Sequence, residues 1–270
     1  MITSGWCYTL EQPHLTAYPT QAESPESLPD LDEALRSIGE YQRRLRANRN
    51  KAVLLLVHGL DASGKDSLIR TLATFMDPAG FKAWSFGRPE GVEARHDFLW
   101  RFVPLLPAFG EVVAFNRSYH EGVIAERVWP VRVPESYDWT QRYKAVRDFE
   151  KNLVNEGTTV IKCWLNVSQQ EHRKRLLKRL ERPHKQWKFD HADLDAWDRR
   201  AELLRYTEEA LAATHTPQAP WLIIPGDSKA MARRITAAVV ADVLRSLAPD
   251  YPDVDKSLLA TYRQRLGEDV

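Results

Sequence analysis

Apolar residues follow two different periods along the chain, and the two periods alternate. Segments rich in apolar residues predict strands, at residues 52–57, 81–86, 111–115, 158–167 and 221–224. The first of them is an uninterrupted apolar run, which is typical of a parallel strand buried on both faces. Apolar residues three or four positions apart predict helices, at residues 30–49, 68–76, 96–101, 139–156, 168–182, 193–213 and 228–247. This alternation predicts an α/β fold with a parallel sheet, right-handed crossovers and helices on both faces.

Local signals divide the chain into an arm, a domain and a tail. Residues 1–29 contain several prolines and no periodicity, which is typical of an irregular arm lying over a domain. Residues 30–247 hold every predicted strand, and residues 248–270 are expected to form a loose surface tail. Ser168 and Glu171 match a capping box. We therefore expect residues 168–213 to form a helical hairpin that acts as a lid on the sheet.

The loop after the first predicted strand has the spacing G-x-x-x-x-G-K of a phosphate-binding loop. Two glycines let several backbone N–H groups converge on one anion, and the following helix directs its positive end toward that anion. An ordinary loop is the alternative, but the flanking strand and helix favour phosphate binding. The expected phosphate contacts are Gly59, Ala62, Ser63, Gly64, Lys65, Asp66 and Ser67.

This loop departs from the usual pattern at the position after the lysine. A hydroxyl that binds magnesium normally stands there, whereas this chain has Asp66, with Ser67 one step later. One helical step is a rotation of about 100°, so Ser67 is not expected to point where that hydroxyl points. Asp61 offers another route, because an acid among phosphates repels them unless it binds a cation or handles a proton.

Two further strand ends carry polar side chains at the edge where ligands bind in open parallel sheets. Arg88 follows the second predicted strand and is a candidate phosphate contact, with an ordinary turn arginine as the alternative. Asn116 and Arg117 follow the third, where loop-type kinases place an acid that is directed at the metal. An arginine at this edge is better explained by phosphate than by packing. We expect a magnesium site at Asp61, Asn116 and Glu121.

Basic residues gather on one face of the first lid helix. Arg175, Arg179 and Arg182 lie at i, i+4 and i+7, and Lys185 and Lys188 extend the positive stretch. A solvated surface helix is the usual explanation of such a run. Charges of nearly one sign instead favour binding of a polyanion.

Composition narrows the class of protein. A formal net charge of +1 over 270 residues argues against a nucleic-acid coat, so any anion site must be local. Cys7 and Cys163 are too few for a disulfide framework or a zinc knuckle, which favours a reduced, cytoplasmic setting. Neither a signal peptide nor a membrane span is expected, because no apolar run approaches the roughly 20 residues required.

The assembled motifs resemble those of the polyphosphate kinase 2 family over about residues 30–247. They are GLDASGKDSLIR, HDFLWR, FNRSYHEG, RLERPHKQWKF and THTPQAPWLIIP, in that order. The resemblance implies a P-loop kinase fold with a helical lid that transfers phosphoryl groups between inorganic polyphosphate and a nucleoside mono- or diphosphate, with Mg²⁺. We also expect a homo-oligomer.

The same resemblance implies roles for individual residues. Lys65 and the loop backbone would hold phosphates, Asp61 would orient magnesium or the attacking oxygen, and Arg117 would brace the transferring group. These three residues are the expected catalytic set. The expected polyphosphate contacts on the lid are Arg175, Arg179, Lys185 and Lys188.

Departures from the family pattern leave other functions open. Asn116 stands where many members have Asp, which resembles the branch that also accepts nucleoside monophosphates. Gly122 replaces a common acid, and residues 200–203 lack the usual aromatic and acidic cluster. An ATP-dependent small-molecule kinase, or a binding protein that has lost turnover, are the alternatives.

Overall fold

The computed structural model describes residues 5–23, 28–131, 133, 136–187, 189–248 and 250–267, except for the side chains of His184 and Lys185. Its centre is a parallel sheet of five strands in the order β2-β3-β1-β4-β5. The strands are β1 (Ala52–His58), β2 (Phe81–Ser85), β3 (Val112–Asn116), β4 (Thr158–Asn166) and β5 (Trp221–Pro225). The α/β prediction is therefore confirmed.

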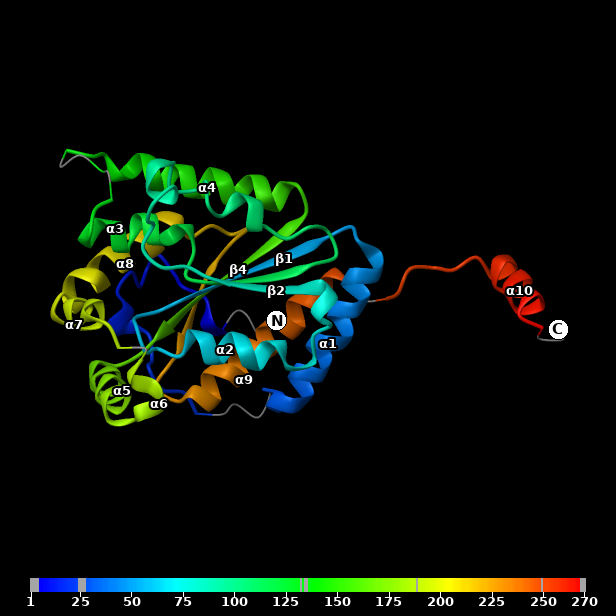
Figure 1. The fold of residues 1–270 in the computed structure, drawn as a ribbon, viewed down its shortest axis with the longest axis horizontal. Coiled ribbons are helices and arrows are strands. Elements are labelled where there is room, and N and C mark those ends of the chain that lie inside the picture. The colour runs from blue at the N-terminus through cyan, green and yellow to red at the C-terminus, as the bar shows by residue number, and fades with distance from the viewer. Residues whose placement is uncertain are drawn as a thin grey trace.

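Helices cover both faces of this sheet (Figure 1). One layer contains α1 (Leu31–Asn48), α2 (Lys65–Leu72) and α9 (Lys229–Leu247). The opposite layer contains α3 (Ala125–Val128), α4 (Trp139–Asn155) and α8 (Arg200–Thr214). The remaining helices are α5 (Gln169–Glu181), α6 (Pro183–Gln186), α7 (His191–Asp198) and α10 (Lys256–Arg265). No helix in the described ranges is both long and apolar enough to cross a membrane.

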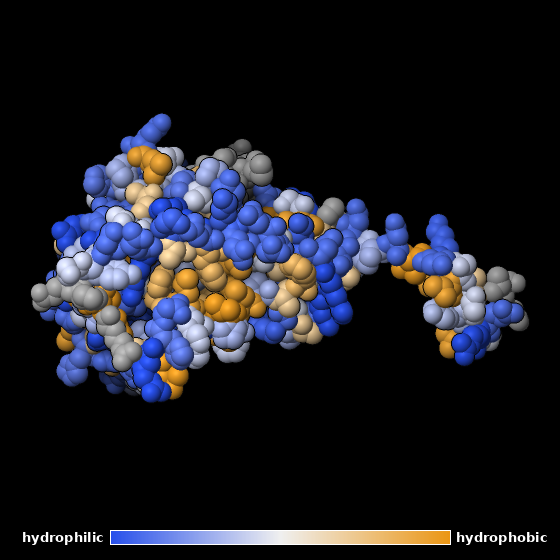
Figure 2. Space-filling view, turned by 90° about the horizontal axis from the view of Figure 1, so that it is seen from above, coloured by the Kyte–Doolittle hydropathy of each residue, from blue (hydrophilic) through white to orange (hydrophobic). Residues whose placement is uncertain are grey.

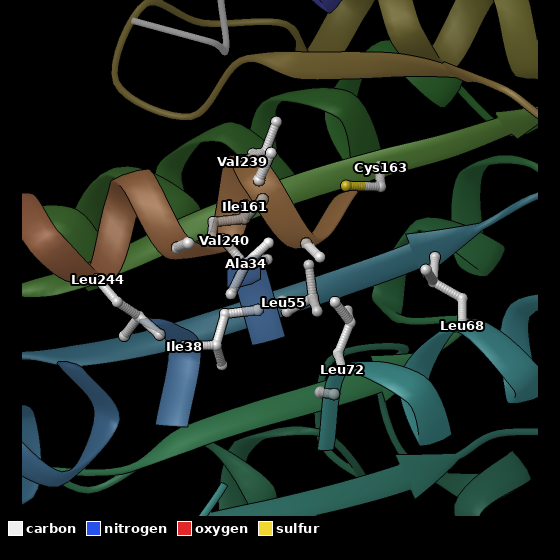
Figure 3. Close-up of a cluster of buried hydrophobic side chains, with 14 of the residues drawn as sticks. Ala34, Ile38, Leu55, Leu68, Leu72, Ile161, Cys163, Val239, Val240 and Leu244 are labelled. Carbon is white, nitrogen blue, oxygen red and sulfur yellow. The ribbon is translucent and has the colours of Figure 1, made fainter. Parts of the chain in front are cut away.

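The central strand β1 is buried along its whole length because it lies between β3 and β4. Alternate side chains point to opposite layers, so Leu55 packs with α1, α2 and α9, as Figure 3 shows. Leu54 and Leu56 pack instead toward α4 and α8. Both faces of β1 are therefore held by apolar contacts, and the loop after it starts from a rigid base.

The lid hairpin confirms one expected helix and corrects the other. Ser168 caps α5 by accepting a hydrogen bond from Glu171 N, as the capping signal predicts. The returning helix, predicted as one element over residues 193–213, is instead divided into α7 and α8, which meet at Arg199. Arg199 donates to Val128 O at 2.8 Å and so ties this break to α3.

Three other expectations are corrected. The segment 96–101 forms consecutive turns rather than a helix, and Asp97 accepts a hydrogen bond from Leu99 N. The third strand begins and ends one residue later than predicted, which places Asn116 inside β3. The tail contains the helix α10, which stands away from the body and is exposed throughout (Figure 1).

The described part of the arm, residues 5–23, lies along β5 and the lid hinges. Cys7 forms an antiparallel bridge with Leu222, and Tyr8 N donates to Trp221 O. Leu15 N donates to Glu208 of α8 at 2.7 Å. The arm therefore contacts the sheet and the return of the lid at once.

Candidate functional site

The phosphate loop has the backbone conformation that its two glycines were expected to allow. Gly59 has φ 145° and Gly64 has φ 114°, a region that side chains rarely adopt. A Cβ at Gly59 would also lie 2.8 Å from Ser63 Oγ. Because α2 begins at Lys65, its free N–H groups lie at the end of this loop. The loop and the helix together form an anion site.

Lys65 is buried inside this loop, where its ammonium group is held by the loop's own carbonyls. Nζ donates to Gly59 O at 2.8 Å and to Leu60 O at 3.0 Å. Burial lowers the pKa of Lys65 to about 8, although Asp61 acts in the opposite direction. The cation is therefore preorganised, and its charge is only partly offset by carboxylates.

Asp61 and Arg117 form an ion pair across the mouth of the loop. Arg117 has φ 63°, which is costly for a residue with a side chain and is typical of functional sites. Burial alone would raise the pKa of Asp61, but Arg117 and Lys65 outweigh it and hold that pKa below its usual value. Asp61 is therefore an anion that balances the two cations nearest the loop.

The residues after Lys65 are arranged differently from those of the usual loop. Ser67 Oγ donates to Gly64 O at 2.9 Å, so this hydroxyl turns back onto the loop backbone. The Asp66 carboxylate accepts a hydrogen bond from Asn116 Nδ2. Asn116 Oδ1 is buried and has no hydrogen-bond partner among the described residues. An oxygen acceptor therefore faces the site at the end of β3.

Two cavities adjoin the Asp61–Arg117 pair. One, of about 530 Å³, lies over the phosphate loop and is lined by Lys65 and by cations from several elements, namely Arg70, Lys178, Arg179 and Lys229. The other, of about 270 Å³, combines polar groups with apolar side chains such as Leu60, Trp129 and Leu203. Both cavities include Asp61 and Arg117 in their walls. Two ligands can therefore approach the same ion pair from different sides.

Three of these cations were not among the residues expected from sequence. Arg70 lies on α2, Lys178 on α5 and Lys229 at the first position of α9. Lys229 lies four residues after the end of β5, so the rule that ligands bind at strand ends could have found it. Lys178 could not be separated by spacing from the other lysines and arginines of α5.

Comparison with known proteins identifies the family. The sequence profile described as Polyphosphate kinase 2 (PPK2) matches residues 22–252. The chain belongs to the polyphosphate kinase 2 family. It is 36% identical over 95% of both chains to the ADP-polyphosphate phosphotransferase of Rhodopseudomonas palustris. It is 38% identical over 80% of both chains to the AMP/ADP-polyphosphate phosphotransferase of Meiothermus ruber.

Solved structures agree with this assignment. The crystal structure of polyphosphate kinase 2 from Arthrobacter aurescens superimposes with a TM-score of 0.82 and 33% identity, covering 87% of this chain and 84% of that one. The P-loop kinase-like sheet expected from the motifs is thus shown by a structural neighbour as well as by the strand order.

Arg175, which was expected to bind polyphosphate from the lid, lines the larger cavity but is held mainly by contacts within the protein. It is buried, and its guanidinium donates to Ser63 O at 2.6 Å and to Gly226 O at 2.7 Å. Its Nε donates to Glu171. Arg175 therefore joins the lid to the phosphate loop and to the turn after β5, and these contacts occupy most of its donors.

The other lid cations have separate environments. Arg179 makes a two-pronged ion pair with Asp193 of α7, at 3.0 and 2.8 Å, and also lines the larger cavity. The side chain of Lys185 and all of Lys188 lie outside the described residues. Arg88 lines the smaller cavity and makes a long contact of 3.5 Å to Pro130 O. The single basic face expected from spacing is thus divided by tertiary contacts.

Gly122 lies close to the ring of Phe98. A Cβ at Gly122 would lie 2.6 Å from the Phe98 ring. Arg142 stacks over the same ring at 4.8 Å and donates to Gly122 O at 2.7 Å. An aromatic ring and a guanidinium therefore occupy the space next to Gly122.

Glu121 is backed by a buried chain of polar groups. Its carboxylate lies 3.2 Å from His58 Nδ1, and His58 Nε2 lies 2.8 Å from Ser118 Oγ. Burial raises the pKa of Glu121, but His58, Arg117 and Lys65 outweigh it and the net shift is downward. A carboxylate in this position stays ionised.

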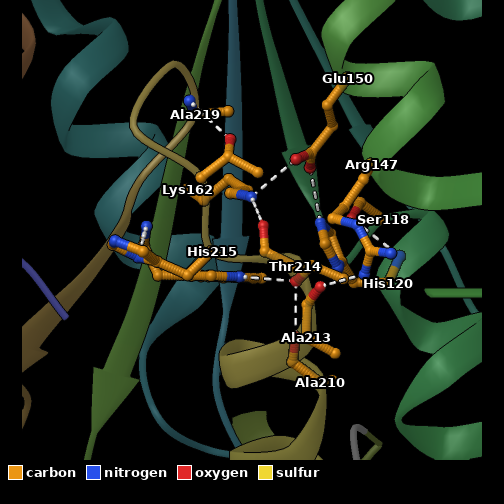
Figure 4. A network of polar contacts seen from close by, with 12 residues as sticks. Ser118, His120, Arg147, Glu150, Lys162, Ala210, Ala213, Thr214, His215 and Ala219 are labelled. Carbon is orange, nitrogen blue, oxygen red and sulfur yellow. Dashed lines mark hydrogen bonds and ion pairs between the residues drawn. The ribbon is translucent and has the colours of Figure 1, made fainter. Parts of the chain in front are cut away.

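A second polar network lies behind the first, between β4 and α4 (Figure 4). Glu150 accepts hydrogen bonds from Lys162 Nζ at 2.7 Å and pairs with His120 at 2.8 Å, with all three side chains buried. Lys162 Nζ also donates to Thr214 O at 2.8 Å. Because removing one member would leave a buried charge unpaired, this network fixes the end of α8 to the sheet.

The expected magnesium ligands are Asp61, Asn116 and Glu121, which all lie near the phosphate loop. In the described residues no group of three or more His, Cys, Asp or Glu could hold a metal. Magnesium usually binds one or two protein carboxylates together with substrate phosphates and waters. Asp61 and the unpartnered Asn116 Oδ1 fit that limited set. The donors therefore suit a metal shared with a phosphate ligand and do not form a closed protein cage.

Proposed function

We propose that this protein transfers phosphoryl groups from inorganic polyphosphate to nucleoside mono- or diphosphates, as the names of its relatives state for them. The observation that carries this proposal is the pair of cavities that meet at Asp61 and Arg117. A donor and an acceptor that both bear phosphates would need such an arrangement. The cation-lined cavity suits a long polyanion, and the half-apolar cavity suits a nucleotide.

The proposed mechanism is positioning combined with neutralisation of charge. Lys65 and the loop N–H groups would bind the transferring phosphoryl group, and Arg117 would brace its equatorial oxygens. Asp61 would hold Arg117 in place and keep the acceptor phosphate in line. The protein forms no covalent intermediate in this scheme.

Magnesium would supply charge neutralisation between the phosphates of donor and acceptor. Asp61 and Asn116 Oδ1 are the residues that would hold it, and Glu121 would act from the second cavity. These three residues retain the roles proposed from sequence, and the charged Asp61 and Glu121 support them.

The polyphosphate contacts are proposed to be Lys178, Arg179, Lys229 and Arg70, together with Lys185 and Lys188 from sequence. Their support is the position of the first four in the wall of the larger cavity. We propose that Arg175 positions the loop, because its donors are occupied by backbone carbonyls and Glu171.

The experiment that tests this function mixes the purified protein with magnesium, polyphosphate and one acceptor at a time. AMP, ADP, GDP and CDP are the acceptors, and chromatography detects the new nucleotide. The expected result is formation of ATP from ADP. Formation of ADP from AMP would extend the function to monophosphates, as Asn116 suggests. A product with ATP and a small alcohol, but none with polyphosphate, would instead identify an ATP-dependent kinase.

We also propose a cytoplasmic homo-oligomer that binds neither nucleic acid nor membrane. The reduced setting is supported by Cys7 and Cys163, which are both free thiols. Self-association is supported by the exposed apolar residues of α10, which Figure 2 shows apart from the body.

A further inference from the structure

His172 is a buried side chain whose polar atoms have no partner. It lies in the first turn of α5, is 2% exposed and forms part of the wall of the 270 Å³ cavity. Neither ring nitrogen meets full hydrogen-bond geometry with a residue in the described ranges, although the Asp61 backbone lies close enough to favour the protonated ring. Its ring is tilted against Trp197 with 5.3 Å between centroids. Packing therefore explains where the ring lies but not why it is an imidazole.

A buried imidazole without partners carries a cost that an apolar side chain would avoid. An imidazole with its ordinary pKa of about 6.5 is mostly neutral at physiological pH. A neutral imidazole has one N–H donor and one acceptor nitrogen, so it can donate one hydrogen bond to a ligand and accept another from it.

The surroundings of His172 indicate whether it would contact the phosphates or the nucleoside of a bound nucleotide. Most of the cations that suit phosphates line the other cavity. The cavity of His172 has Arg88, Arg101 and Arg117 in its wall, together with the apolar side chains of Leu60, Trp164 and Leu203. A neutral ring is a poor partner for phosphate beside such cations, and apolar walls suit a nucleoside.

We propose that His172 hydrogen-bonds the nucleoside part of the acceptor, its base or its ribose, and is a specificity-determining residue. This inference rests on the proposed function, because it assumes that the acceptor is a nucleotide in the smaller cavity. It adds a residue of the lid, absent from the expected site, to those that recognise the acceptor.

The first test compares His172→Phe with His172→Gln. Phe keeps an aromatic ring against Trp197 and removes both nitrogens, whereas Gln keeps a donor and an acceptor. His172→Phe should raise the KM for ADP about tenfold, the usual order for loss of a buried hydrogen bond. The KM for polyphosphate should stay within about twofold, and His172→Gln should recover part of the loss.

His191→Phe is the matched control, because His191 is exposed at the start of α7 in the same lid. It should leave both KM values unchanged. Thermal unfolding of each variant shows whether it folds. If His172→Phe does not fold, the comparison of wild type with His172→Gln across the acceptors below decides instead.

The second test identifies the contacted group. ADP, 2′-deoxy-ADP, 3′-deoxy-ADP and IDP are compared in the wild type and in both variants. The acceptor that lacks the contacted group should show the same KM in wild type and variant, because the interaction is already absent. An equal penalty for every acceptor would overturn the proposal.

A different pattern would identify His172 as a contact of the phosphate loop rather than of the nucleoside. In that case kcat would fall, or the KM for polyphosphate would rise with that for ADP. Titration calorimetry with ADP alone separates this proposal from the proposed function. ADP binding that weakens in His172→Phe supports the contact even if no phosphoryl transfer is seen, and unchanged or absent ADP binding overturns it.

Discussion

Lys65 brings a full positive charge to the phosphate loop, and its side chain has no apolar role there. Nζ is held by two loop carbonyls, so the charge already lies where a phosphate would bind. Lys65→Ala should lose at least about 10²-fold in turnover if one preorganised donor is worth roughly 3 kcal/mol. Turnover is measured with ADP and polyphosphate at saturation. Near wild-type turnover in a folded variant would exclude this role.

The buried position of Lys65 also predicts the pH dependence. Because burial lowers its pKa to about 8, the free enzyme should lose the ammonium, and so kcat/KM, as pH rises through about 8. Bound phosphate favours the ammonium, so kcat should persist to higher pH. Lys65→Arg keeps its charge over this range and should remove the step from whatever activity remains.

Lys65 also makes the stability of the fold depend on pH, but stability should rise with pH where kcat/KM falls. The unfolded chain keeps this proton to about pH 10.4, whereas the folded chain releases it near 8. Between these values the unfolded state binds more protons, so this contribution to the free energy of unfolding rises with pH. A fall in kcat/KM above pH 8 without loss of stability is therefore expected. Denaturant unfolding at pH 7.5 and 9 checks the second part.

Asp61 is the carboxylate that balances Arg117 and Lys65, and it is the residue best placed to bind a metal shared with substrate. Asp61→Asn keeps the shape but removes the charge, so turnover should collapse while the thermal unfolding midpoint changes little. Turnover is then titrated with magnesium. Full recovery at high magnesium would limit Asp61 to metal binding, and an unchanged rate without extra metal would remove it from the mechanism.

At the residue scale, the sequence predicts what local spacing determines. Gly59, Gly64 and Lys65 follow from one short pattern, and the structure places them as that pattern requires. Arg175 could not be predicted, because its partners Ser63 and Gly226 are 112 and 51 residues away in the chain. Helical spacing alone cannot predict contacts between residues so far apart in the sequence.

At the scale of elements, the same limit explains which helices were predicted correctly. Long amphipathic helices such as α1, α4 and α9 were predicted within two residues of their observed bounds. The division of α7 from α8 was missed because Arg199, a good helix former, turns there to reach Val128 O. Tertiary contacts override helix propensity at this point.

The first lid helix is the element that separates a polyphosphate enzyme from a nucleotide kinase. Lys178 of α5 and Lys229 of α9 line the larger cavity, so a long polyanion would release counterions on binding them. Lys178→Gln with Lys229→Gln should raise the KM for long polyphosphate several-fold and flatten its dependence on salt. The KM for ADP should change less.

Lys174→Gln is the control for that double variant. Lys174 lies on the same helix but its side chain is 72% exposed and does not line the cavity. It should leave the salt dependence unchanged. The double variant could instead raise the KM for ADP and leave the KM for polyphosphate unchanged. In that case the larger cavity binds the nucleotide and the smaller one binds polyphosphate, which is the reverse of our assignment.

At the scale of the whole molecule, the site lies where three separate parts of the chain are held together. The sheet supplies the phosphate loop and the end of β3, the lid supplies cations, and the arm contacts both the sheet and α8. The sheet order follows from alternation of strands and helices, whereas the path of the arm depends on single contacts that carry no period. The sequence therefore predicts the layers of the fold better than it predicts the path of the N-terminal arm that connects them.

The tail carries apolar surface that the body of the molecule does not cover. One side of α10 and of its C-terminal cap carries four apolar side chains that are 43% to 87% exposed, namely Leu258, Leu259, Tyr262 and Leu266. Water-exposed stripes of this kind are usually buried in an interface. We expect two or more copies of this chain to bury them together. The chain shortened to residues 1–248 should then have the mass of a monomer by light scattering, whereas the full chain should be larger.

A milder variant checks that the apolar stripe itself, rather than the length of the tail, causes this association. Replacing Leu258, Leu259 and Tyr262 by Ser should lower the mass as truncation does, because it removes the apolar area and keeps the chain length. Gln264→Ser, on the opposite side of α10, is the control and should keep the larger mass. A full-length chain that is monomeric at all concentrations tested would show that the stripe binds something other than a second copy.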